Sequence, residues 1–136
     1  MTTEGLKPHP VSVQFEDCFF FDSYAIIEII KGNPNYLQFK NSAIATSKLN
    51  VFEVFYYLLR EFGEGVATNI SRYYYNSIID FDHSILSSAA KFKLENKKQN
   101  LSMADCIGYK IAEFLGIKFL TGDSQFKDKP NVEFVK

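Results

Sequence analysis

Four acidic residues stand where their side chains could act together. Asp22 and Asp123 follow short apolar runs that favour buried β-strands, whereas Glu53 and Asp105 fall near the starts of helical patterns. In open α/β sheets ligands bind at the carboxyl ends of the strands, and right-handed crossovers start the following helices near the same edge. The sequence therefore predicts that the four carboxylates converge on one cleft.

Carboxylates gathered in one cleft repel each other, which raises at least one pKa unless a cation is present. Their hard oxygen atoms, with no His or Cys among them, favour Mg²⁺ or Mn²⁺ over zinc. Such an ion polarises a phosphoryl oxygen and activates a water molecule, which suits phosphodiester cleavage. We expect Asp22 and Asp105 to be the principal metal ligands, with Glu53 and Asp123 completing the site or orienting the water.

Each acid also has a purely structural explanation. Glu53 and Asp105 each stand three residues after a polar residue, Asn50 and Ser102, which is the spacing of a helix capping box. Asp22 could cap the helix that follows it. The sequence alone leaves both explanations open.

Alternating strand and helix patterns predict a three-layer α/β/α domain with a mainly parallel sheet. Strands are expected at residues 19–21, 43–47, 77–81, 118–121 and 132–135. Helices are expected at residues 23–31, 51–62, 67–76, 83–95 and 103–115. An alternation at residues 11–15 predicts either a short edge strand or a loosely held extension.

Length and composition fit a single globular domain. The 136 residues suffice for one core, and an apolar share of 46% argues against a disordered chain. A net charge of -1 excludes a broadly basic nucleic-acid-binding surface but allows a local basic patch. No apolar stretch approaches the roughly 20 residues of a membrane span, and no secretory signal is visible. We therefore expect a cytoplasmic protein with no membrane association.

Other side chains have both a functional and a structural interpretation. The four lysines between residues 91 and 98 could contact a phosphate backbone or form a solvated helix face. The tyrosines at 73–75 could stack on bases or serve core and dimer packing. Thr121 and Ser124 could hydrogen-bond the acids or stabilise the turn in which they lie.

The sequence resembles a PIN domain from Cys18 to Lys136. The resemblance rests on the segments FFDS (20–23), NVFE (50–53), LSMAD (101–105) and FLTGDSQF (119–126), in this order and spacing. It divides the chain into an N-terminal extension, residues 1–17, and a PIN-like nuclease domain, residues 18–136.

The resemblance implies a metal-dependent ribonuclease with five parallel strands, whose four acids hold Mg²⁺ or Mn²⁺. Ser23 and Thr121 match positions that support those acids in the family. Single-domain members of this length are most similar to VapC toxins, which imply an RNA substrate, a homodimer and a small antitoxin encoded alongside. Many relatives carry another acid where this chain has Gln125.

Three other functions fit parts of the pattern. One is a housekeeping RNA-processing nuclease without an antitoxin, and another is a non-catalytic binding module that keeps the fold. The third is a phosphate-handling signalling domain or phosphatase, which would need a second acid beside Asp22. Ser23 and Tyr24 do not supply that acid.

Overall fold

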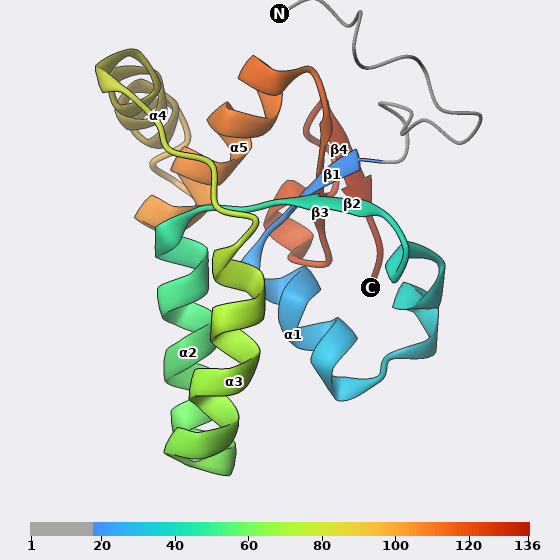
Figure 1. The fold of residues 1–136 in the computed structure, drawn as a ribbon. Helices are drawn as coiled ribbons and strands as arrows, with labels where there is room; N and C mark the ends of the chain where they lie inside the picture. The colour runs from blue at the N-terminus through green and yellow to red at the C-terminus, as the bar shows by residue number, and fades with distance from the viewer. Residues whose placement is uncertain (1–17) are drawn as a thin grey trace, which may run out of the picture.

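A parallel β-sheet forms the centre of the fold, which the computed structural model describes for residues 18–136 (Figure 1). The strands lie in the order β2-β1-β3-β4, and every neighbouring pair is parallel. They are β1 (Cys18–Phe21), β2 (Ala43–Ala45), β3 (Lys118–Thr121) and β4 (Val132–Phe134). The segment 11–15, expected as an edge strand or an extension, lies outside the described residues.

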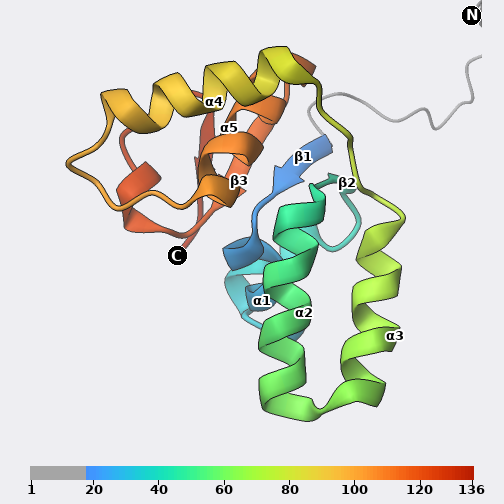
Figure 2. The ribbon, with the colours of Figure 1, turned by 90° about the vertical axis from the view of Figure 1, so that its left-hand side faces the viewer.

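Helices connect the strands and cover both faces of the sheet (Figures 1 and 2). The α-helices are α1 (Ser23–Lys31), α2 (Lys48–Phe62), α3 (Glu64–Tyr75), α4 (His83–Glu95) and α5 (Met103–Leu115). Two short 3-10 helices are η2 (Pro34–Phe39) and η3 (Ser124–Phe126). In both views α2 and α3 form an antiparallel hairpin that projects away from the sheet. Among the described residues, no helix is long and apolar enough to cross a membrane.

The two central strands bury side chains on both faces because successive residues of a strand point in opposite directions. Phe20 and Phe119 pack into a core with α4 and α5, and their stacked rings lie 5.7 Å apart. Phe21 and Leu120 pack into a second core with α1, α2 and α3. The predicted three-layer α/β/α class is therefore confirmed.

The sheet has four strands within residues 18–136, and the prediction of five was wrong for this part of the chain. The segment expected as a strand at 77–81 makes a single parallel bridge, between Thr46 and Ile78. The amide of Thr46 donates to the carbonyl of Ser77, and the amide of Ile79 donates to the carbonyl of Thr46. Pairing stops there because β2 has already ended and Ser47 caps the helix that begins at Lys48.

Helix starts were predicted well where a cap residue is unambiguous. Asp82 and Ser102 cap α4 and α5 as expected, and Asp22 caps α1, which the sequence had left open. The helix α2 begins three residues earlier than predicted because Ser47, and not Asn50, is its cap. The structural explanation of Glu53 as a capping-box acid with Asn50 is thus wrong.

The close packing of α5 on the sheet predicts a strong effect of Gly108→Ala. A Cβ atom at this position would lie 2.6 Å from the ring of Phe20 and 3.2 Å from that of Phe119. We expect this overpacking to lower the free energy of unfolding by about 1–3 kcal/mol, measured by urea denaturation.

The matched control is Gly65→Ala in α3, where a Cβ atom would meet nothing within 4 Å. This change should leave stability unchanged or raise it by up to about 1 kcal/mol. Equal losses of stability in both variants would show that contact of the added methyl group with Phe20 and Phe119 is not the cause of the loss.

Candidate functional site

Asp22 and Asp123 lie at the carboxyl edge of the two central strands. Asp22 follows β1 directly, and its amide donates to the carbonyl of Leu120 in β3 at 3.3 Å. Asp123 follows β3 after Gly122. A Cβ atom on Gly122 would collide with the ring of Tyr24 and with the backbone carbonyl of Val135, so only glycine fits at this turn.

Glu53 reaches the same edge from α2 through a chain of hydrogen bonds. The hydroxyl of Ser47 donates to the side-chain oxygen of Asn50 at 2.6 Å, and the Asn50 amide donates to the hydroxyl of Ser23 at 3.0 Å. The Ser23 hydroxyl in turn donates to the Glu53 carboxylate. Because Ser23 directly follows Asp22, this chain ties α2 to the end of β1.

Asp105 lies in the first turn of α5. Its carboxylate accepts from the amide of Ser102 at 2.9 Å, and its own amide donates to the Ser102 hydroxyl at 3.0 Å, so the predicted capping box is present. The helix ends at Leu115, is capped by Gly116 and leads into β3 at Lys118. Its first turn therefore lies at the carboxyl edge of the sheet, on the side where β3 ends.

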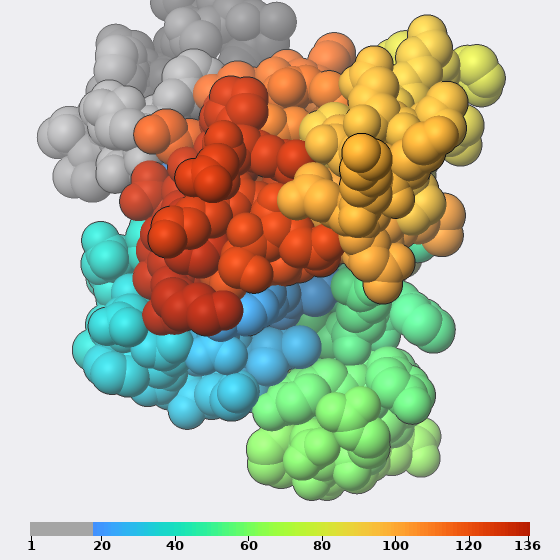
Figure 3. All heavy atoms as spheres, turned by 180° about the vertical axis from the view of Figure 1, so that it is seen from behind, coloured from blue at the N-terminus to red at the C-terminus, as the bar shows by residue number. Residues whose placement is uncertain are grey.

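The space-filling view shows these segments meeting (Figure 3). On this face the blue atoms of the β1–α1 region, the green atoms of α2, the gold atoms of the α4–α5 connection and the red atoms of the last segment adjoin one another. Segments that are far apart in the sequence thus share one surface.

Asp22 is the most strongly perturbed of the acids. Its side chain is buried, with 2% of the residue exposed. Burial raises the pKa of Asp22 to about 8, and the negative charges of Asp105 and Asp123 add to the rise. Hydrogen bonds from the Thr121 hydroxyl and the Ala25 amide oppose the rise without cancelling it. Asp22 therefore carries a charge at neutral pH only with additional stabilisation.

Burial and neighbouring charges also raise the pKa values of two other acids, Glu53 and Asp105. Burial raises the pKa of Glu53, the hydrogen bond from Ser23 lowers it, and the charge of Asp105 raises it further. Burial raises the pKa of Asp105, its hydrogen bonds to Ser102 lower it, and the charges of Asp123 and Lys93 act in opposite directions. The four acids therefore form one electrostatically coupled set.

The coupled acids are near each other but are not gathered around one point. Within residues 18–136, no three His, Cys, Asp or Glu side chains are grouped closely enough to hold a metal ion. Instead each acid is engaged locally, as Asp123 is by accepting from the amide of Gln125 at 3.0 Å. Ligation of a common ion would require the carboxylates to turn from these local hydrogen bonds.

The donor set nevertheless fits a hard divalent cation. All four groups offer carboxylate oxygens, which Mg²⁺ and Mn²⁺ prefer. Burial is the largest cause of the raised pKa of Asp22, and the negative charges of Asp105 and Asp123 raise it further. No positively charged side chain is among the groups that shift this pKa. A positive ion at this edge would supply to Asp22 the charge that no described side chain supplies to it.

Sequence reasoning missed Ser47 and Asn50 as parts of this site. Both side chains are buried and polar, and both act on Glu53 through Ser23. The available signal was the position of Asn50, which precedes Glu53 by three residues and so lies on the same face of α2. A buried asparagine on the face of an acid indicates a hydrogen-bonding partner.

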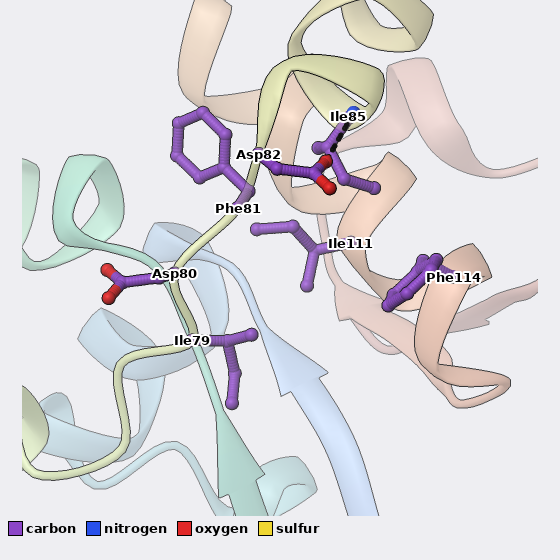
Figure 4. A pocket seen from close by; sticks show the side chains of 7 residues that line it. All are labelled: Ile79, Asp80, Phe81, Asp82, Ile85, Ile111 and Phe114. Carbon is purple, nitrogen blue, oxygen red and sulfur yellow. Dashed lines mark hydrogen bonds between the residues drawn. The ribbon is translucent and has the colours of Figure 1, made fainter.

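The apolar cavity shown in Figure 4 does not contain the four acids. It has a volume of about 290 Å³ and is lined by Ile79, Asp80, Phe81, Asp82, Ile85, Ile111 and Phe114. Asp82 is turned toward the backbone of α4, where its carboxylate accepts from the amide of Ile85 (Figure 4). This cavity offers apolar surface and no grouped carboxylates.

Comparison with protein families assigns the chain to a known family. The model of the PIN domain family matches residues 19–132. The chain therefore belongs to the PIN domain family, as the sequence motifs predicted. No curated protein matches the chain.

Solved structures share the fold at low sequence identity. One is described as a toxin-antitoxin complex from Klebsiella pneumoniae, with a TM-score of 0.68, 20% identity, and coverage of 85% of this chain and 95% of that one. Mycobacterium tuberculosis VapC20, a toxin that cleaves the sarcin-ricin loop, has a TM-score of 0.71 and 16% identity. The match covers 87% of this chain and 99% of that one. VapBC2 from Rickettsia felis, bound to a DNA fragment from its promoter, has a TM-score of 0.67 and 19% identity. The match covers 88% of this chain and 99% of that one.

The raised pKa of Asp22 predicts a pH-dependent stability. Because the pKa of about 8 lies above the unfolded value of about 3.9, the folded protein binds more protons than the unfolded chain between these values. The free energy of unfolding should then fall as pH rises from about 4 to 8, by up to about 1.4 kcal/mol per pH unit for this group. Urea denaturation in EDTA measures the slope.

Asp22→Asn should flatten this slope, whereas the exposed Asp128→Asn should keep it. Mg²⁺ or Mn²⁺ should also flatten it in the parent chain, because a ligated carboxylate no longer needs a proton. Parallel curves for Asp22→Asn and the parent would mean that Asp22 is not the titrating group.

Proposed function

We propose that this chain is a divalent-metal-dependent endoribonuclease that cleaves RNA phosphodiester bonds. The observation that carries the proposal is the placement of Asp22, Glu53, Asp105 and Asp123 along one edge of a PIN-family sheet, where their charges affect one another. The nuclease domain is assigned to residues 18–136, with residues 1–17 as an extension. The low identity to the VapC structures means that their likeness supports the fold, and the acids support the chemistry.

The proposed roles of the four acids follow from their surroundings. Asp22 and Asp105 are the proposed principal ligands of Mg²⁺ or Mn²⁺, with Asp123 completing the set. The Thr121 hydroxyl hydrogen-bonds Asp22 and also accepts from the amide of Asp123 at 3.0 Å, so one side chain orients two acids. The ion would polarise the scissile phosphoryl oxygen and make a water molecule nucleophilic.

Glu53 is the proposed residue that orients the attacking water. One of its carboxylate oxygens accepts from Ser23, which fixes the direction of the other. The raised pKa of Glu53, caused mainly by burial, favours proton acceptance from that water. Ser23 and Asn50 act here as positioning residues.

A role as the toxin of a toxin-antitoxin pair is the proposed biological setting. The similar structures described as a toxin-antitoxin complex and as a toxin support it. The α2–α3 hairpin also exposes large apolar side chains that a partner could cover, including Phe52, Tyr56, Tyr73 and Tyr75. A small antitoxin, a second copy of the chain in a homodimer and a cytoplasmic location complete the proposal.

Asp22→Asn and Asp105→Asn should each reduce RNA cleavage by at least about 100-fold, because each removes a proposed ligand of the ion. Cleavage of a labelled RNA by the purified protein in Mn²⁺, followed on a denaturing gel, measures this loss. The exposed Asp128→Asn should retain activity, and EDTA should abolish it. Equal cleavage by all variants would contradict the proposed site.

Expression of the parent chain in a bacterial host without any partner protein should arrest growth. The Asp22→Asn chain at the same expression level should not, because arrest requires cleavage. Colony counts after induction measure the difference. Normal growth with a chain that cleaves RNA in vitro would instead favour a housekeeping RNA-processing nuclease.

A further inference from the structure

The proposed site needs positive charge close to its acids. The four carboxylates lie on one edge of the sheet, and RNA is a polyanion. The chain has a net charge of -1, so its overall charge does not attract RNA. The contacts that hold the substrate must therefore come from a local group of cations.

An open cavity of about 420 Å³ beside the site supplies such a group. It lies between α4 and the connection to α5, and is lined by Ala90, Lys93, Leu94, Lys97, Gln99 and Asn100. Lys93 lies in the last turn of α4 and Lys97 in the turn that follows the end of this helix at Glu95, and both are exposed and line the cavity.

Lys93 joins this cavity to the acids. Its ammonium group donates to the backbone carbonyl of Leu101, the residue before the cap of α5. Burial raises the pKa of Asp105, and the charge of Lys93 opposes this rise, so the two side chains interact across the start of α5. A lysine ammonium has three donors, and two remain for a ligand.

The wall of the cavity is held in place by bonds to the segment around η3. The Gln125 side chain accepts from the amide of Asn100 at 2.9 Å, and the Gln125 carbonyl accepts from the Gln99 side chain at 3.0 Å. Lys129 donates to Asn96 at 2.9 Å. Gln125 therefore braces the connection without adding a negative charge beside the lysines.

We propose that Lys93 and Lys97 bind a backbone phosphate of the RNA substrate adjacent to the phosphate that is cleaved. This inference rests on the proposed ribonuclease function and names the residues that hold its substrate. The competing explanation is that lysines at the end of α4 only offset the helix dipole. That explanation predicts a change in stability with no change in RNA binding.

The test measures binding of a short fluorescein-labelled single-stranded RNA to the full Asp22→Asn chain, which limits cleavage. Fluorescence anisotropy is recorded from about 50 to 200 mM salt. Lys97→Gln should reduce the slope of log affinity against log salt in part, and adding Lys93→Gln as well should bring the total reduction to about 0.7, the value for one phosphate. Lys118→Gln, an exposed lysine at the opposite edge of the sheet, should leave the slope unchanged.

Lys93→Arg separates charge from structure, because it keeps the charge and can still donate to Leu101. It should retain parental binding, and thermal melting identifies any variant that fails to fold. An unchanged salt slope in folded Lys97→Gln, or an equal loss in Lys118→Gln, would overturn the inference.

Two further outcomes separate the inference from the function on which it rests. If the parent cleaves RNA and the lysine variants bind and cleave it equally well, only the phosphate subsite fails. If the parent neither binds nor cleaves RNA, both proposals fail. Binding of oligoglutamate, a model of an acidic protein segment, is measured in the same way. If the lysine variants lose oligoglutamate binding but keep RNA binding, the lysines bind an acidic protein partner and the phosphate subsite is overturned.

Discussion

A carboxylate buried at the end of a central strand is the constraint on which the site depends. Asp22 is 2% exposed, because the strand before it carries aromatic side chains into both cores. A charge at this position has lost most of its hydration and has two other acids near it. The group must therefore be protonated or stabilised by a cation, and the proposed metal site follows from the second possibility.

The parallel sheet makes the gathering of acids possible. Parallel strands end at one edge, so residues after β1 and β3 are neighbours although a hundred residues separate them. The helices α2 and α5 bring their first turns to the same edge, because each begins or ends next to a strand. Gly122 allows the turn after β3 to pass close to Tyr24 and Val135, which keeps Asp123 beside Asp22.

Neutral polar residues hold the acids at this edge through hydrogen bonds without adding charge to it. Thr121 contacts two acids, and Asn50 and Ser23 direct Glu53. Gln125, where many family members have an acid, instead ties the α4–α5 connection to η3. Its hydrogen bonds to Gln99 and Asn100 give the lysine-lined cavity a fixed wall.

The sequence by itself determined the α/β class and most helix caps, and it pointed to the four acids on which the proposed site rests. Those features depend on local patterns, such as the apolar run before Asp22 and the Ser102 cap with its acid three residues later. Only the tertiary structure decided that Asn50 is buried against Ser23 and that the segment 77–81 pairs through one bridge. These outcomes depend on contacts between distant segments, which local residue patterns do not encode.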